Sequence, residues 1–191
     1  MHRAPSQIRT ITLFAATIVL TSAAFTETPL QPRIVDQRPF QVVGIAASTN
    51  NAKEAGPDGI IGKQWQRFMS EGLLNKIPNR VDQSIVAVYA DYTSDAHGEY
   101  TLVLGAKVKP VPNPTIPEGM VVKTVPAGRY AVFTSQRGPA AKVVPDLWRQ
   151  IWTYFQSPQN GQRAYQADFE VYDQPASDPS NVQVDIYVGV K

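Results

Sequence analysis

The chain has 191 residues, with 18 basic side chains, 16 acidic side chains and no cysteine. The lack of cysteine excludes a disulfide framework and an anchor attached through a lipid-modified cysteine. Without residues 1–24, which contain two of the basic residues and none of the acidic ones, the formal charge is 16 − 16 = 0. A neutral domain without runs of Lys or Arg lacks the electrostatic footprint of a nucleic-acid-binding protein, so no nucleic-acid partner is expected.

The first 24 residues have the pattern of a signal peptide. Arg3 and Arg9 precede an apolar run over 11–25, and the small residues Ser22 and Ala24 fit a cleavage site after Ala24. A retained membrane anchor is the alternative, but spanning needs about 20 apolar residues, and this run is shorter and interrupted by Thr and Ser. We therefore expect a periplasmic or secreted protein with no stable membrane span after cleavage.

The remainder divides into an arm and one folded domain. Residues 25–38 contain two prolines among polar residues and are typical of a flexible arm. Residues 39–191 are expected to form the domain, as a first repeat over about 39–108 and a second over about 119–191. The linker between them, 109–118, contains four prolines, which exclude a helix or a central strand there.

Each repeat predicts a strand, a helix and two further strands. In the first, the pattern predicts a strand over 40–47, a loop over 50–59, a helix from Ile61 to about Gly72, and strands over 84–92 and 99–108. The second begins with strands over 120–125 and 129–135, separated by a turn at 126–128.

The second repeat continues with a helix over 147–155 and strands over 167–173 and 182–190. Pro145 is expected in the first turn of that helix. The predicted fold class is α+β, with one antiparallel sheet of about eight strands and two main helices on one face.

Aromatic spacing shows the duplication directly. Trp65 and Tyr89 are separated by the same interval as Trp148 and Tyr172, because 89 − 65 = 172 − 148 = 24. Two residues before each of these tyrosines, the first repeat has Ala87 and the second has Glu170. A carboxylate added to one copy of a duplicated scaffold suggests a binding site.

Several segments of the second repeat resemble the GyrI-like small-molecule-binding family, the effector-binding domain also found in AraC-type and MerR-type transcription regulators. They are 126–133 (PAGRYAVF), the Gly138-Pro139 pair, the helix with Trp148 and Trp152, and 168–172 (DFEVY). The resemblance implies a pseudo-symmetric sheet with a ligand cleft, in which the glutamate of the last segment, here Glu170, receives a cationic or polar aromatic ligand. The chain departs from the regulators because it has no helix-turn-helix segment and carries an export signal, so transcriptional control is not implied.

Strand alternation places Glu170 and Tyr172 on one face and Phe169 and Val171 on the other. If the apolar pair faces the helices, Glu170 points to the open face of the sheet. There it is either a solvated acid or a carboxylate half-buried among aromatic rings, with a raised pKa unless a cation compensates it.

The other candidate ligand-binding residues are aromatic. Tyr89 holds the position in the first repeat that matches Tyr172, and Tyr130 lies on a predicted strand. Trp65 and Trp148 are interpreted as scaffold, whereas Trp152 has no tryptophan counterpart and is expected to line the cleft.

No cofactor and no metal are expected. His97 is the only histidine after the signal peptide and lies in a hairpin loop, and the common nucleophile and phosphate-loop motifs are missing. The leading hypothesis is an exported module that binds a small cationic or polar aromatic molecule. The alternative is a hydrolase of electrophilic cyclopropanoid-type compounds with Glu170 as general base, which the resemblance implies for some stand-alone members. A third possibility is an interaction protein that uses the open sheet face.

Overall fold

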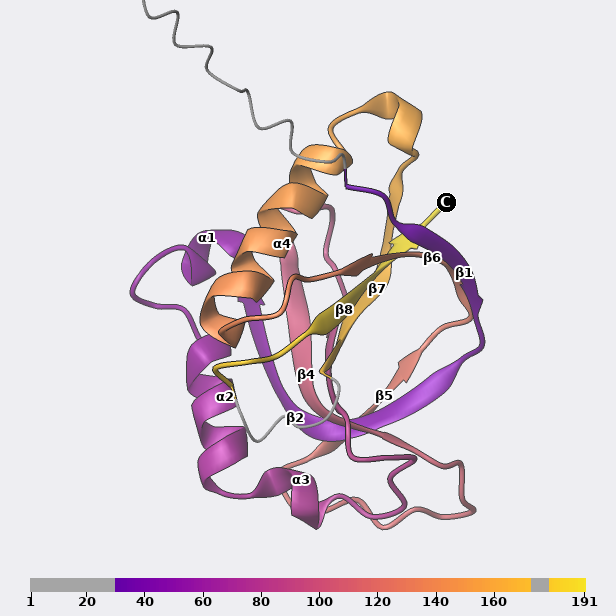
Figure 1. Cartoon of the computed structure of the whole chain (residues 1–191). Helices are drawn as coiled ribbons and strands as arrows, with labels where there is room; N and C mark the ends of the chain where they lie inside the picture. Colours follow the sequence, from indigo (N-terminus) through magenta and orange to yellow (C-terminus); the bar gives the residue numbers. More distant parts are fainter. Residues whose placement is uncertain (1–29, 173–178) are drawn as a thin grey trace, which may run out of the picture.

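The computed structural model describes residues 30–172 and 179–191, which form eight strands and four α-helices (Figure 1). The predicted signal peptide lies outside the described residues. The strands are β1 (Arg33–Gln37), β2 (Phe40–Asn50), β3 (Ile85–Ala90), β4 (Glu99–Val108), β5 (Val121–Val125), β6 (Gly128–Thr134), β7 (Arg163–Tyr172) and β8 (Val184–Val190). The helices are α1 (Asn51–Glu54), α2 (Ile61–Ser70), α3 (Leu73–Lys76) and α4 (Ala140–Tyr154), and a 3₁₀ turn covers Pro158–Asn160.

The strands form one antiparallel sheet in the order β1-β6-β8-β7-β3-β4-β2-β5. Read from its centre outward, each half contains the same three strands of one repeat, β3-β4-β2 or β7-β8-β6, followed by an edge strand. The edge strands are exchanged: β1 precedes the first repeat but pairs with β6 of the second, and β5 pairs with β2. The predicted duplicated α+β fold is confirmed, and the exchanged edges tie its halves together.

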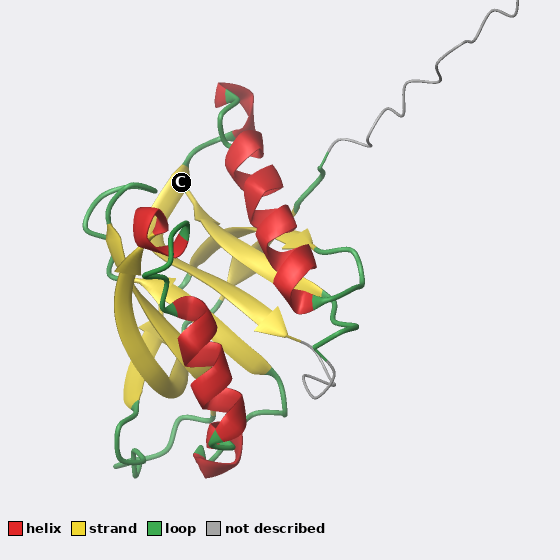
Figure 2. Cartoon of the chain, turned by 90° about the vertical axis from the view of Figure 1, so that its left-hand side faces the viewer, coloured by secondary structure: helices red, strands yellow, loops and turns green. Residues whose placement is uncertain are grey.

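Both long helices lie on the same face of the sheet, as Figure 2 shows. The apolar positions Ile61, Trp65 and Phe68 share one side of α2, and this helix ends before Gly72, whose φ of 60° suits glycine after a helix. At the beginning of α2, the Glu54 carboxylate accepts hydrogen bonds from the backbone N–H groups of Ile60 and Ile61, at 2.9 and 3.1 Å. These contacts satisfy donors that would otherwise have no partner and hold the start of α2 in place.

The curved sheet has a packed cluster on each face. The larger cluster joins the inner sides of α2 and α4 to the sheet, with Phe68, Leu147 and Ile151 fully or nearly buried. The second cluster lies on the opposite face and contains Val42, Val88 and Phe169. Both faces of the central strands are therefore buried, and so are all six residues of β3.

At one point β2 and β4 approach very closely. Gly44 and Gly105 are direct cross-strand partners. A Cβ atom on Gly105 would lie 1.9 Å from the carbonyl oxygen of Val43, and one on Gly44 would lie 2.2 Å from that of Leu104. Glycine at both positions is required by this contact.

Three local predictions need correction. Arg33–Gln37, expected within the flexible arm over 25–38, is strand β1, because β6 supplies a distant pairing partner. The expected loop over 50–59 contains the short helix α1. Pro145 lies inside α4 and not in its first turn, since the helix begins at Ala140 after Pro139. Residues 109–118 contain neither helix nor strand, as their prolines predicted.

Candidate functional site

Glu170 lies at the centre of the duplicated fold. Ala87 is its counterpart in the first repeat, because 170 − 87 = 148 − 65 = 83. Ala87 is also its direct cross-strand partner in the β3–β7 pair. Two residues that are both equivalent and adjacent must straddle the pseudo-twofold axis, so the single carboxylate stands where the two repeats meet.

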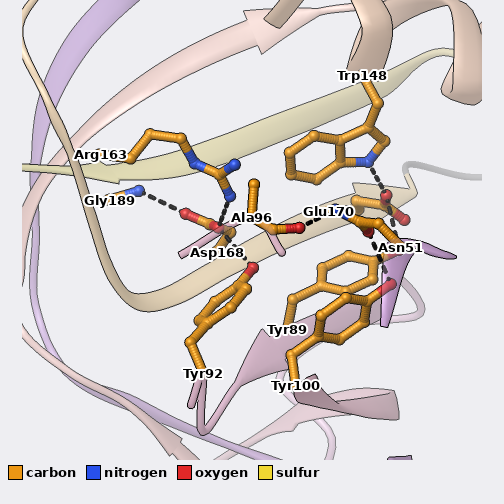
Figure 3. A network of polar contacts seen from close by, with 10 residues as sticks. All are labelled: Asn51, Tyr89, Tyr92, Ala96, Tyr100, Trp148, Arg163, Asp168, Glu170 and Gly189. Carbon is orange, nitrogen blue, oxygen red and sulfur yellow. Dashed lines mark hydrogen bonds and ion pairs between the residues drawn. The ribbon is translucent and has the colours of Figure 1, made fainter. Parts of the chain in front are cut away.

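Three donors hold this carboxylate, two of which are symmetry-related. The Tyr89 hydroxyl donates to Oε1 at 2.9 Å, and the Tyr172 hydroxyl donates to Oε2 at 2.7 Å. The third is the indole N–H of Trp148 on α4, which donates to Oε1 at 2.6 Å (Figure 3). The arrangement fixes the orientation of the Glu170 side chain before any ligand arrives.

The carboxylate of Glu170 is completely buried. Burial raises its pKa, and the three hydrogen bonds from Trp148, Tyr172 and Tyr89 offset only part of that rise. Among the ion pairs of the described residues, none includes Glu170. The ionised form is therefore hydrogen-bonded but lacks a positive charge beside it.

A cavity of about 980 Å³ opens above this carboxylate, between α2 and α4. Tyr89, Tyr172 and Glu170 form its floor. Its walls are largely aromatic and apolar, and all three tryptophans of the chain line it: Trp65, Trp148 and Trp152. Trp152 is 40% exposed, which places it toward the solvent side of the cavity. Such a space, apolar with a few convergent polar groups, is typical of a small-molecule site.

The structure brings four of the five predicted ligand-binding residues together. Glu170, Tyr172, Tyr89 and Trp152 all line the cavity. Tyr130 does not, because it lies in the cluster on the opposite face, packs edge-on against Phe169 and donates its hydroxyl to the carbonyl of Pro126.

The condition on which an open-face position of Glu170 depended, namely that Phe169 and Val171 face the helices, is not met. Glu170 points toward the helices, as its bond to Trp148 shows, and Phe169 points away from them. The opposite face is not open: there Phe169 stacks on Tyr187 with ring centroids 4.3 Å apart. The curved sheet thus encloses the second hydrophobic cluster, and the buried carboxylate of Glu170 faces the space between the helices.

The interpretation of Trp148 and Trp65 as scaffold was incomplete. Trp148 donates to the carboxylate, and Trp65 contacts Tyr172 at 4.6 Å between ring centroids while also lining the cavity. Their spacing on amphipathic helices was visible in the sequence, but the rotation of each helix over the sheet was not. The polar pair Arg163 and Asp168 was also missed, although Asp168 shares the strand face of Glu170.

Two further features of the described residues bear on function. They include no group of three or more His, Cys, Asp or Glu side chains able to hold a metal ion. No helix within 30–172 and 179–191 is long and apolar enough to cross a membrane.

This geometry, a duplicated strand–helix–strand–strand sheet with a buried glutamate beneath an aromatic cavity, defines the effector-binding class of proteins. Residues 33–190 match the family model of the integron-associated effector-binding protein. The chain belongs to this family, which has the GyrI-like fold, and the family resemblance seen in the sequence is confirmed.

Known relatives agree with this assignment. The "Putative transcriptional regulator protein YobU" of Bacillus subtilis (strain 168) is 32% identical over 154 residues, which cover 78% of this chain and 90% of that protein. The transcriptional regulator BrlR of Pseudomonas aeruginosa is 30% identical over 163 residues, which cover 84% of this chain but only 56% of BrlR.

Solved structures show the same fold. The integron cassette protein from the mobile metagenome of Vibrio cholerae has a TM-score of 0.66 and 30% identity, covering 85% of this chain and 97% of its own. The structure of SAV2435 bound to tetraphenylphosphonium has a TM-score of 0.69 and 19% identity, covering 85% and 94% of the respective chains.

Proposed function

We propose that this protein binds a small cationic aromatic molecule in the cavity between α2 and α4, and that Glu170 supplies the opposing charge. The observation that supports this proposal most directly is a completely buried carboxylate that has three hydrogen-bond donors and, among residues 30–172 and 179–191, no positively charged partner. An ionised acid in such a place is costly unless a cation joins it. A ligand that brings the positive charge removes this cost at the moment of binding.

The cavity walls suit such a ligand in shape and in chemistry. Aromatic ring faces attract cations by about 0.5–2 kcal/mol, and tryptophan is the best of them. The volume of about 980 Å³ lies near the upper end of drug-sized pockets. SAV2435, which shares the fold, has been captured with tetraphenylphosphonium, a bulky aromatic cation, and this supports the same ligand class here.

The amino-terminal pattern extends the proposal to location. An export signal over residues 1–24 would deliver the binding domain to the periplasm or the medium after cleavage near Ala24. In that compartment the domain would bind its ligand.

Intrinsic fluorescence offers a direct test, because all three tryptophans line the cavity. Two probes of nearly the same shape and opposite charge separate charge recognition from apolar burial: tetraphenylphosphonium and tetraphenylborate. We expect saturable quenching by the phosphonium cation and none by the borate anion. Equal binding of both ions would show that the cavity recognises shape alone and would contradict the role of Glu170.

The alternative is hydrolysis of an electrophilic compound, with Glu170 as general base. The raised pKa of Glu170 favours it, because a base works best when its pKa lies near the working pH. The phenols of Tyr89 and Tyr172, both bonded to the carboxylate, would be the nearest acids. Turnover of a cyclopropanoid substrate that is lost in Glu170→Gln would establish this activity, and unchanged substrate with retained binding would exclude it.

A further inference from the structure

A buried ion pair between Asp168 and Arg163 lies beside the cavity. Asp168 is two residues before Glu170 on the same face of β7, and Arg163 is the first residue of that strand. Asp168 is fully buried and Arg163 is 7% exposed. Arg163 donates from Nη2 to Oδ2 of Asp168 at 2.5 Å, and the Tyr92 hydroxyl donates to the same oxygen at 2.7 Å. The backbone N–H of Gly189 donates to Oδ1 at 2.9 Å, as Figure 3 shows. Both carboxylate oxygens of Asp168 therefore accept hydrogen bonds within the protein.

The guanidinium of Arg163 has hydrogen-bond donors that are not used within the described part of the protein. A guanidinium carries five N–H donors. In the described part of the chain, its side chain donates a hydrogen bond to Asp168 alone, and its Nε atom is buried without an acceptor. The guanidinium lies 4.5 Å from the ring of Tyr165 and 5.7 Å from that of Trp148, and Arg163 lines the cavity. The cavity thus contains a buried donor group with unused capacity.

The duplicated fold shows that this pair is specific to the second repeat. Arg163 and Asp168 correspond to Arg80 and Ile85, because 163 − 80 = 168 − 85 = 83. Arg80 donates instead to the backbone carbonyls of Leu74 and Ile77 near the end of α3. Arg80 also has an Nε atom without an acceptor, but it does not line the cavity. Both buried acids of β7, Asp168 and Glu170, therefore replace apolar residues of β3 on the side where the cavity lies.

We propose that Arg163 is a second recognition point of the cavity, which donates a hydrogen bond to a neutral acceptor oxygen, such as a ketone or amide carbonyl, on the same ligand. This inference rests on the proposed function, because it describes the other end of a ligand whose cationic end meets Glu170. A neutral acceptor fits better than an anion, since Asp168 already offsets the charge of Arg163 and Glu170 repels a second negative charge.

Trp148 contacts both recognition points. Its indole N–H contacts Glu170, and its ring faces the guanidinium of Arg163. Asp168 is two residues from Glu170 on β7, a rise of roughly 7 Å along the strand. Because the guanidinium of Arg163 is hydrogen-bonded to Asp168, the acceptor oxygen should lie on the order of that distance from the cationic group. The ligand class is therefore a flat cation with a carbonyl at the opposite end of one bicyclic ring system.

Two matched probes test this assignment: 6-acetyl-1-methylquinolinium and 6-isopropenyl-1-methylquinolinium, in which a CH₂ group replaces the carbonyl oxygen. Tryptophan quenching by the wild-type protein should give a preference of about tenfold or more for the acetyl probe, since a hydrogen bond from a charged donor contributes at least that. The double variant Arg163→Met with Asp168→Asn removes both charges of the pair together. In this variant the ratio of the Kd values of the two probes should fall to about one. In Glu170→Gln both probes should weaken by the same factor and the preference should remain.

The outcomes separate the two proposals. If the wild type binds both quinolinium probes equally, or if the preference survives in the double variant, the Arg163 subsite is refuted while the proposed function stands. If neither probe binds, both fail together. Should the double variant not fold, the infrared carbonyl stretch of the acetyl probe bound to wild type decides: a frequency at or below its value in water supports the bond to Arg163, and the higher value of an apolar solvent refutes it.

Discussion

Replacing Glu170 with glutamine removes one charge and almost nothing else. The amide has the shape of the carboxylate, and its oxygen can take the place of Oε1, where Trp148 and Tyr89 donate. Its NH₂ group would then face Tyr172, whose hydroxyl can rotate to accept a hydrogen bond. We therefore expect Glu170→Gln to fold with the cavity intact, so that a change in affinity reports the charge.

The expected loss of affinity is large because the carboxylate is buried. Removing one partner of a buried charge pair costs about 3–5 kcal/mol. The carboxylate of Glu170 is already desolvated in the free protein, so part of the cost of burial is met before binding. Taking the lower end, about 3 kcal/mol, the Kd for tetraphenylphosphonium should rise by about 100-fold.

Tryptophan quenching and calorimetry both measure this change, and Glu118→Gln provides the matched control. Glu118 is exposed and lies in the linker between the repeats, so the same chemical substitution there should leave the Kd within a factor of about two. A Glu170→Gln protein that binds the cation as tightly as the Glu118→Gln control would refute the reasoning, since the buried charge would then contribute nothing.

Three further predictions follow from the same geometry. Tyr89→Phe and Tyr172→Phe each remove one bond to Glu170 from symmetric positions, so calorimetry should show both weakening cation binding by a similar amount, about 1.5–3 kcal/mol; a large effect of one and none of the other would contradict the shared role. The folded-state pKa of Glu170 lies above its ordinary value of 4.5, so the folded protein retains this proton longer than the unfolded chain. Denaturant unfolding of the ligand-free protein should therefore show the free energy of unfolding of wild type falling relative to Glu170→Gln as pH rises from 4.5 through the raised pKa, whereas parallel curves would show an ordinary carboxyl group. Gly105→Ala should destabilise the fold by about 1–3 kcal/mol, because the added Cβ would collide with the backbone of β2. The control Gly62→Ala, in open space on α2, should be neutral or stabilising by up to about 1 kcal/mol. Equal melting temperatures of the two variants would contradict the close approach of the strands.

Local patterns predicted the elements and the principal site residue. The spacing of Ile61, Trp65 and Phe68 has the helical period. An acid between Phe169 and Val171 in a predicted strand marked Glu170 as unusual. The duplication added a second signal, because Ala87 showed what the scaffold contains without a site. These features are local or repeated, so they can be read without knowledge of the tertiary structure.

Long-range relations could not be read in this way. Alternation divides β7 into two faces but does not say which one the helices cover. An apolar face normally packs against helices, but here the curved sheet itself buries the face that contains Phe169. Strand β1 was missed because its pairing partner, β6, is almost 100 residues away. The bond from Trp148 to Glu170 depends on how α4 is rotated over the sheet, which its own periodicity does not determine.

The most direct measurement is the protonation of Glu170 itself, followed by the carbon-13 chemical shift of its side-chain carboxyl group across a pH range. In the free protein the midpoint should lie above the ordinary glutamate value of 4.5, and saturation with tetraphenylphosphonium should move it downward as the cation stabilises the ionised form. A midpoint near 4.5 that does not change when the cation is added would contradict the account.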